Sequence, residues 1–290
     1  MNKNKRGDDN KLYYFIRVGS DSNEDVPFSM IIDNKLLFIP ITETDPENNG
    51  KIDEYSFDEI SKFKYYSNLI RYFGRVDKTD FLNFHLDPFF DFNNSGEMSY
   101  CDRTINENGK RITKAIALDN LRPSKRKKYL FFLATVVTPT ENELKNFKDL
   151  SWDEVRARQK NMKKKLALIG FMKVDNIHLL SSLNFSSKKS EICRIFKSNP
   201  HVKRIETEKE ELDKDKNKKL IFVRGNLDKS LFLFENPLIL GESKNKHYEL
   251  YSENKKFFNN KLNSFGYRAY KFFNNSTLNL HLLLEHLKLK

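Results

Sequence analysis

The chain has 290 residues, of which 38% are hydrophobic and 13% aromatic, so its apolar content suffices for one large domain or two modest ones. Its net charge of +12 favours an anionic partner, nucleic acid first. Two cysteines, Cys101 and Cys193, exclude a disulfide framework, and no stretch approaches the ~18 apolar residues that a membrane helix needs. Because the first residues lack the apolar core of a signal peptide, we expect a soluble, cytoplasmic protein without a membrane partner.

The first third of the chain predicts short strands and one helical segment. Residues 1–10 are polar and charged, and we expect them to be disordered. Residues 11–16 predict a buried strand because the run is short, aromatic and β-branched. Residues 30–32 and 36–41 predict two short strands around a turn. The apolar spacing over 56–73 predicts one helix or two short ones.

The middle of the chain predicts a loop-rich stretch, a helix and two strands. Residues 85–103 predict an extended, loop-rich stretch. Residues 128–137 and 165–174 predict strands, because both runs are apolar and rich in β-branched or aromatic side chains. Between them, the capping-box signature SWDE at 151–154 predicts a helix that continues to about residue 164.

The last third predicts further helices and strands. Residues 188–197 predict a helix, and the mixed-charge run 206–219 predicts a solvated loop or an exposed helix. Residues 220–223 predict a buried strand. The tail predicts a helix over 252–263, a strand over 267–273 and a helix from about residue 277.

Interleaved strands and helices indicate an α+β fold with a mixed or antiparallel central sheet flanked by helices. No linker marks a boundary, so we expect residues 11–245 to form one domain, with 246–290 as a helical and strand extension packed on the same unit. The middle strands, YLFFLATVV and LALIGFMKV, resemble barrel strands of the PUA-like superfamily, which includes readers of modified bases. Gly170 would permit a close approach of neighbouring strands. The sheet could therefore include a partly PUA-like barrel.

Three polar clusters stand out, and two of them directly follow strands. They are RVGSDS at 17–22, NPHVKR at 199–204 and RGNLDKS at 224–230. Loops at strand ends are where a rigid scaffold presents functional groups. In the first and third clusters an Arg fork could bind phosphate, while an Asp accepts from a sugar hydroxyl or a base amine. Gly225 would let backbone N–H groups approach an anion. The alternative is an Arg–Asp ion pair that only fixes a turn.

His85 and Asp87 would lie on one face of an extended segment. Such a pair could orient a general base or bind a metal, but one His and one Asp are too few ligands, so no metal is predicted. His201, on a rigid turn beside Lys203 and Arg204, could act as an acid or base or contact a phosphate. The sequence contains no GxGxxG, GxxxxGK, paired CxxC or GxSxG motif, and it identifies no cofactor.

Four motifs occur in an order that resembles the nucleotide modification associated domain 3 family, a group associated with DNA base modification. They are RVGSDS near the start, HLDPFFDF at 85–92, NPHVKR at 199–204 and FVRGNLDKS at 222–230. Residues 129–134 and 168–171 are similar to the two middle strands of that family, and the resemblance touches about residues 11–245. It implies a nucleic-acid-modification context and partner proteins of a modification system. It also favours Asp87 over His85 and supports a role for His201.

On this basis the sequence predicts a set of site residues. The predicted catalytic residues are Asp21, Asp87 and His201. The predicted phosphate- or nucleotide-binding residues are Arg17, Ser22, Arg204, Arg224, Asp228 and Ser230. We expect at least four of Arg17, Asp21, Asp87, His201 and Arg224 to line one pocket.

Two basic segments could follow a phosphate backbone. They supply Arg122, Lys125, Arg126 and Lys127 before the first middle strand, and Arg156 and Arg158 on the helix before the second. Because both segments adjoin the middle strands, they could share one basic face; the alternative is ordinary solvated surface. The expected partner is DNA, RNA or a free nucleotide.

Three functions remain open from the sequence. The first is a base-modification enzyme or its accessory, which would gather polar groups with perturbed pKa values in one deep pocket. The second is a non-catalytic reader of modified nucleic acid, which would show an aromatic cage opening onto a basic surface. The third is a defence-associated scaffold with neither feature.

Overall fold

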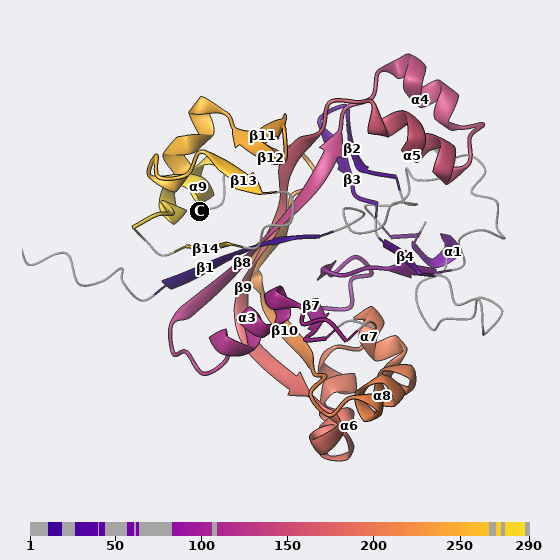
Figure 1. Cartoon of the computed structure of the whole chain (residues 1–290), viewed down its shortest axis with the longest axis vertical. Helices are drawn as coiled ribbons and strands as arrows, with labels where there is room; N and C mark the ends of the chain where they lie inside the picture. Colours follow the sequence, from indigo (N-terminus) through magenta and orange to yellow (C-terminus); the bar gives the residue numbers. More distant parts are fainter. Residues whose placement is uncertain are drawn as a thin grey trace, which may run out of the picture.

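The computed structural model describes residues 11–18, 27–39, 41–43, 57–60, 62–63, 83–105, 109–266, 271–273 and 276–287. Within these ranges, twelve strands form one sheet with parallel and antiparallel pairs, and two further strands form a small separate sheet. Helices flank the large sheet (Figure 1), so the fold is α+β as predicted. Residues 1–10, Asp21 and Ser22 lie outside the described residues.

The centre of the large sheet is the long strand β9 (Lys165–Leu180). Its first part pairs antiparallel with β8 (Lys127–Val137) and with β11 (Leu238–Lys244). Most of its length pairs antiparallel with β10 (Leu220–Phe232). The sheet is mixed because β1 (Lys11–Arg17) runs parallel to β8. These strands confirm the predicted strands at 11–16, 128–137 and 165–174, although β9 continues well beyond residue 174.

The remaining strands are short and extend the sheet from both sides. In the large sheet they are β2 (Ser29–Ile32), β3 (Lys35–Leu37), β6 (Phe89–Phe90), β7 (Met98–Arg103), β12 (His247–Leu250), β13 (Ser264–Gly266) and β14 (Lys271–Phe273). The separate sheet pairs β4 (Ile41–Glu43) with β5 (Asn83–His85). Strands β12, β13 and β14 show that the 246–290 segment contributes directly to the main sheet.

Helices gather at two ends of the sheet. Near one end lie α4 (Glu141–Phe147) and α5 (Trp152–Lys160), and near the other lie α6 (Phe185–Ile195), α7 (Pro200–Lys203) and α8 (Ile205–Lys214) (Figure 1). The capping box predicted for α5 is present, because Ser151 Oγ accepts from Glu154 N while the Glu154 carboxylate accepts from Ser151 N. The other helical segments are α1 (Phe57–Ile60), α3 (Thr113–Leu121), α9 (Leu280–His286) and the 3₁₀ turns η2 (Ser182–Asn184) and η3 (Ser252–Phe258).

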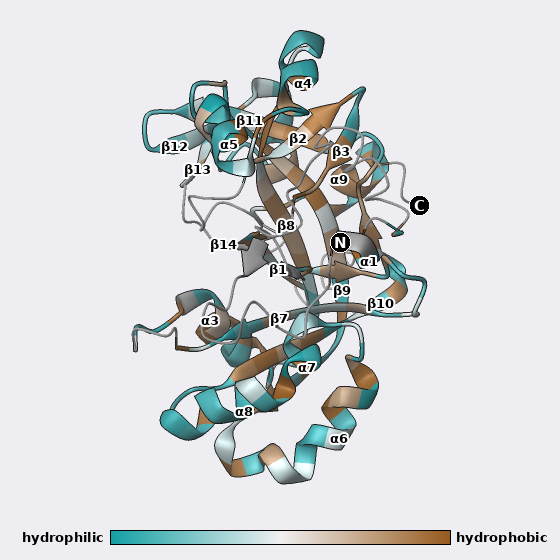
Figure 2. Cartoon of the chain, turned by 90° about the vertical axis from the view of Figure 1, so that its right-hand side faces the viewer, coloured by the Kyte–Doolittle hydropathy of each residue, from teal (hydrophilic) through white to brown (hydrophobic). Residues whose placement is uncertain are grey.

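In the part of the chain that the structure describes, alternating side chains on the strands build three hydrophobic cores. On β1, Tyr14 and Ile16 face one core, whereas Tyr13 and Phe15 face a second core shared with the C-terminal segment. A third core, which includes Phe196 of the α6 C-terminus, lies between β7, β10 and the α6–α8 helices. Figure 2 shows the hydrophobic colouring concentrated on the central strands and hydrophilic colouring on the outer turns of α8. This third core fixes the position of α7 and α8 over the sheet.

Two sequence predictions about loops are wrong. Residues 98–103 form β7 instead of a loop, because Tyr100 and Cys101 are buried and the segment pairs with β10. Residues 224–230 belong to β10 instead of forming a loop after it. The β9–β10 register shifts on both sides of Gly225, which lies against Met172 so closely that a Cβ atom would overlap its side chain. The polar residues at 224–230 therefore belong to an irregular part of strand β10.

The close strand approach predicted at Gly170 is confirmed. A Cβ atom at this position would lie 2.6 Å from Phe90 Cζ and 2.9 Å from Leu231 O, closer than real Cβ contacts allow. The predicted tail helix at 252–263 is instead the shorter 3₁₀ segment η3. Among the described residues, no helix combines the length and apolar character needed to cross a membrane.

Candidate functional site

His85, Asp87 and His201 form a buried group that we call the histidine–aspartate cluster. His85 ends β5, Asp87 follows in the link to β6, and His201 lies in α7. Asp87 Oδ2 is 4.0 Å from His85 Nε2 and 3.8 Å from His201 Nε2. The two imidazole rings pack edge to face with centroids 4.7 Å apart. Each of the three residues is at most 8% exposed. The fold thus brings together side chains from distant parts of the sequence.

The position of His201 is set by the start of α7. Asn199 caps this short helix, because its Oδ1 accepts from His201 N at 3.1 Å, and Pro200 occupies the first helical turn. The Asn199 side-chain amide also donates to Ser99 Oγ on β7 at 3.2 Å. Ser99 in turn donates to Glu97 Oε1 at 2.7 Å. The predicted rigid turn is therefore a capped helix start, anchored to the sheet with its histidine turned inward.

Asp87 is held by the backbone of β7. Cys101 N lies 2.9 Å and 3.1 Å from the two carboxylate oxygens and donates to them. Burial raises the pKa of Asp87 to about 8, against the opposing effects of His85 and the Cys101 N–H. At neutral pH the carboxyl group is therefore mostly protonated in the absence of a further cation.

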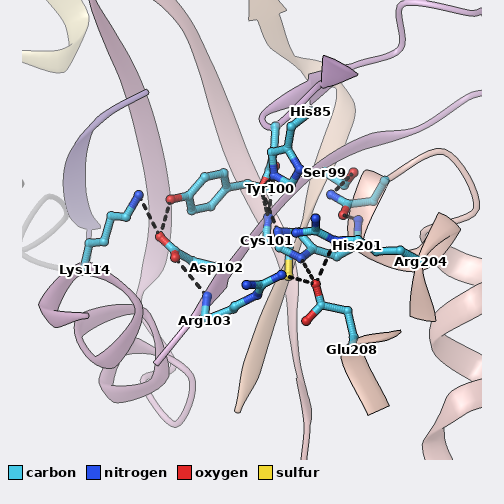
Figure 3. Close-up of polar contacts among 12 residues, drawn as sticks. His85, Ser99, Tyr100, Cys101, Asp102, Arg103, Lys114, His201, Arg204 and Glu208 are labelled. Carbon is cyan, nitrogen blue, oxygen red and sulfur yellow. Dashed lines mark hydrogen bonds and ion pairs between the residues drawn. The ribbon is translucent and has the colours of Figure 1, made fainter. Parts of the chain in front are cut away.

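Glu208 on α8 orients His201 from the other side (Figure 3). Its Oε1 lies 2.7 Å from His201 Nδ1, and it accepts from Arg204 Nε at 3.0 Å and from Arg103 at 2.7 Å. Burial alone would raise the pKa of Glu208, but His201, Arg103 and Arg204 outweigh it and hold that pKa well below its usual range. Burial lowers the pKa of His201 to about 4. His201 is therefore neutral, its Nδ1–H donates to ionised Glu208, and its Nε2 faces Asp87.

A second polar group lies on the opposite face of β7 (Figure 3). Asp102 Oδ2 accepts from Tyr100 Oη at 2.7 Å and pairs with Lys114 Nζ of α3 at 3.0 Å. Burial raises the pKa of Tyr100 well above its usual range. Because successive residues of a strand point to opposite faces, Cys101 and Arg103 point toward the histidine–aspartate cluster and its helices. Strand β7 thus supports both groups.

The structure brings together some of the residues predicted to converge and separates others. Asp87 and His201 share the cluster, and Arg204 joins it through Glu208. Arg17 lies instead where β1, β8 and β12 meet, donating to Thr135 and packing over the Tyr248 ring at 5.0 Å. Arg224 pairs in register with Ser99 of β7, next to the Asn199 contact. Because Asp21 lies outside the described residues, the predicted convergence of Asp21, Asp87, His201 and Arg224 in one pocket stays a prediction.

The third polar cluster has structural contacts within the sheet. Ser230 is buried, and its Oγ accepts from Lys173 N at 3.1 Å, which fixes β10 against β9. Asp228 is exposed in the irregular part of β10. A hollow of about 750 Å³ is lined by residues 231–238 with His286 and Leu287, and it includes none of the predicted site residues that the structure describes.

The two basic segments lie near opposite ends of β8, and a shared basic face stays a prediction. Lys125, Arg126 and Lys127 are exposed before and at the start of β8, whereas α5 lies beyond the far end of that strand (Figure 1). At about 3.3 Å per residue, the eleven residues of β8 separate them by about 30 Å. Arg122, in the first segment, pairs with Asp119.

On α5, only one of the two predicted arginines is exposed. Arg158 is exposed, but Arg156 is 6% exposed, with its guanidinium 3.4 Å from the centre of the Phe28 ring. Its grouping with a nucleic-acid surface is therefore wrong, because the side chain is used in packing.

The sequence did not identify Glu208 or Arg103 as site residues, and it did not predict that His85 belongs to the site. Glu208 falls in a mixed-charge run that resembles a solvated helix, but Ile205 and Leu212 place apolar side chains on its face of α8. That spacing, together with Arg204 four residues before Glu208, was the available signal. His85 belongs to the candidate site because the fold places His201 beside it and Asp87.

Comparison with known proteins gives no match: no family model matches the chain, and neither a curated protein nor a solved structure is found to be similar. The family resemblance of the motifs therefore stays a prediction.

The side chains of the histidine–aspartate cluster have two kinds of chemistry open to them. Their imidazole nitrogens and carboxylate oxygen can exchange protons, or they can bind a transition metal.

The opposed pKa shifts predict how the cluster affects stability with pH. Asp87 has its pKa raised from 3.8 to about 8, so its stabilising contribution is lost as pH rises through this window. His201 has its pKa lowered from 6.5 to about 4, so its contribution is lost as pH falls through that window. The two effects oppose each other between pH 4 and 6.5, and only the Asp87 effect remains above pH 6.5.

We therefore expect the free energy of unfolding to contain a component that falls between pH 6.5 and 8. One proton corresponds to at most about 1.4 kcal/mol per pH unit. Asp87→Asn should remove this component, whereas Asp153→Asn, at an exposed position of α5, should retain it. Urea unfolding across this range, with a chelator present, measures the difference. Identical pH profiles for wild type and Asp87→Asn would contradict the assigned protonation.

Proposed function

We propose that the chain is a nucleotide- or nucleic-acid-directed protein of base modification, with the histidine–aspartate cluster as its reaction centre. The observation that carries this proposal is the meeting of Asp87 and His201, with pKa values shifted in opposite directions to about 8 and about 4. A carboxylic acid that keeps its proton beside a neutral imidazole supplies an acid and a base in one place. Buried groups with such shifts are typical of functional sites.

Two features support nucleotides as the target. The motifs at 85–92 and 199–204, which resemble a base-modification family, are the segments that supply Asp87 and His201 to the cluster. The net charge of +12 and the exposed residues Lys125, Arg126 and Lys127 favour an anionic ligand. We also propose that the chain acts together with partner proteins of a modification system.

The finer fold assignment is also a proposal. Strands β8 and β9 pair antiparallel at the centre of the sheet, and Gly170 allows close packing against β6 and β10. These features support a partly PUA-like barrel built around β8 and β9.

The alternative is a non-catalytic reader of modified nucleic acid. The exposed basic residues 125–127 favour it, because they could bind phosphate without any chemistry. The described surface gives less support for an aromatic cage: its exposed large hydrophobic side chains are Leu183 and Leu227, neither of which is aromatic. A buried acid–base pair is also unnecessary for reading a base. We therefore favour the enzyme or its accessory.

A binding titration tests the proposed ligand class. We expect labelled DNA, RNA or a mononucleotide to bind, with nucleic-acid affinity falling steeply between 50 and 200 mM salt through counterion release. Replacing Lys125, Arg126 and Lys127 by Ala should weaken nucleic-acid binding and reduce the salt slope by up to about 0.9 per lost phosphate contact. Replacing exposed Lys209, Lys214 and Lys216 by Ala removes the same charge elsewhere and serves as the control.

The outcomes separate the ligands. Binding to the mononucleotide alone would identify a free nucleotide as the target. Equal losses in both triple variants would assign the attraction to overall charge and contradict a role for residues 125–127. No binding of any of the three ligands at low salt would contradict the proposed function.

A further inference from the structure

The facing atoms of the histidine–aspartate cluster are too far apart for direct hydrogen bonds and close enough to share one ion. Asp87 Oδ2 lies 3.8 Å and 4.0 Å from the two histidine Nε2 atoms, whereas N···O hydrogen bonds measure about 2.7–3.2 Å. One donor atom from each residue lies within 4.8 Å of the other two. Ligands bound tetrahedrally at about 2.1 Å would lie about 3.4 Å apart, so a contraction of at most about 1.4 Å would bring all three donor atoms within reach of one ion.

The donor set restricts the kind of ion. Two imidazoles and one carboxylate suit zinc, iron and related first-row transition metals, whereas magnesium and calcium prefer oxygen ligands. Three protein ligands leave at least one coordination position open for water or a substrate atom, which is the arrangement of catalytic rather than structural metal sites. The third ligand comes from α7, which explains why the sequence pair His85 and Asp87 seemed insufficient.

The surroundings already orient two of the ligands. His201 Nδ1 is 2.7 Å from Glu208 Oε1, so its Nε2 is the nitrogen that faces the cluster. A histidine that binds a metal typically donates its other ring N–H to a carboxylate or a carbonyl in this way. Asp87 is fixed by the N–H of Cys101 on β7. Arg103 and Arg204 hold Glu208 in place.

We propose that His85, Asp87 and His201 bind one divalent first-row transition-metal ion, with Glu208 as a positioning residue for His201. A bound ion would replace the proton of Asp87 and would supply Lewis-acid polarisation or an activated water at this centre in place of a carboxylic acid. Its part in base modification rests on the proposed function, whereas binding of the ion does not. The ion and base-modification proposals can therefore fail separately.

The first measurement is metal content. The full chain is stripped with a chelator, incubated separately with Zn²⁺, Fe²⁺ under anaerobic conditions, Co²⁺ or Mg²⁺, desalted, and analysed by inductively coupled plasma mass spectrometry. We expect one Zn²⁺, Fe²⁺ or Co²⁺ per chain and no retained Mg²⁺. Bound Co²⁺ should also give visible ligand-field bands that depend on the imidazole ligands. A folded wild-type chain that retains none of the transition metals would overturn the proposal.

Variants test which residues hold the ion. His85→Gln and His201→Gln should lose retained metal and change the Co²⁺ bands, and Glu208→Gln should weaken affinity by about 10–100-fold. His281→Gln, on the exposed face of α9, should bind like wild type. Circular dichroism identifies the folded variants, and His85→Gln decides the question if α7 variants do not fold. Retention of one ion by a folded His85→Gln/His201→Gln chain would overturn the assigned ligands.

Two results distinguish this proposal from the proposed function. One ion per chain without any effect on nucleotides would leave the metal site standing and count against base modification. Base modification by a chain kept free of metal would contradict a role of the ion in the reaction and leave the reaction centre standing, whereas binding of the ion is decided by the metal content alone.

Discussion

Asp87→Asn is expected to lower formation of a modified nucleoside by about 10²–10⁴-fold, which is the usual contribution of a proton-transfer group. Asn nearly keeps the shape of Asp, and its Oδ1 can still accept from Cys101 N, but it can neither give up a proton nor bind a metal as a carboxylate. Folding and nucleic-acid affinity should therefore change little. Mass spectrometry measures the amount of modified nucleoside per folded chain in cells that carry the native neighbouring genes. The ratio of this amount between wild type and Asp87→Asn gives the loss.

One control substitution and two alternative outcomes test the role of Asp87. Asp153→Asn, at an exposed position of α5, should form product like wild type. A change in affinity without any product from either chain would favour the reader. A lower melting temperature with unchanged product would make Asp87 a buried structural acceptor.

Glu208→Gln is expected to lower the free energy of unfolding by about 3–5 kcal/mol, the cost of breaking a buried ion pair by removing one partner. Glu208 is 1% exposed and accepts from Arg103, Arg204 and His201 through one oxygen. Gln preserves the volume but removes the charge that these donors share. Urea unfolding at neutral pH measures the loss.

Glu210→Gln provides a matched control on the same helix, because Glu210 is exposed. A surface change of this kind should alter stability by no more than about 0.5 kcal/mol. Equal effects of the two substitutions would show that Glu208 does not hold α7 and α8 in place.

Features with local causes were predictable from the sequence. The strands at 128–137 and 165–174 follow from their own apolar composition, and the start of α5 follows from Ser151 and Glu154. Strand β7 was missed because turn-forming residues precede it and its pairing partner, β10, lies far along the chain. Residues 224–230 were misread because an irregular strand and a polar loop have similar composition.

The candidate site was predictable only in part, for the same reason. The motifs pointed to Asp87 and His201 separately, but only the third core places α7 against the β5–β6 link. Arg17 and Arg224 follow similar strands in sequence, yet Arg17 packs against Tyr248 and Arg224 pairs with Ser99. Sequence similarity between strand ends does not show that those ends share an edge of the sheet.

A nucleoside survey of DNA, RNA and the free nucleotide pool from cells shows most directly whether the histidine–aspartate cluster is a base-modification centre. The cells carry the native neighbouring genes and express either the wild-type chain or the His85→Gln/His201→Gln chain. We expect a nucleoside of altered mass in one fraction, present with the wild-type chain and absent with the variant. Identical nucleoside composition in all three fractions, with both chains folded, would contradict it.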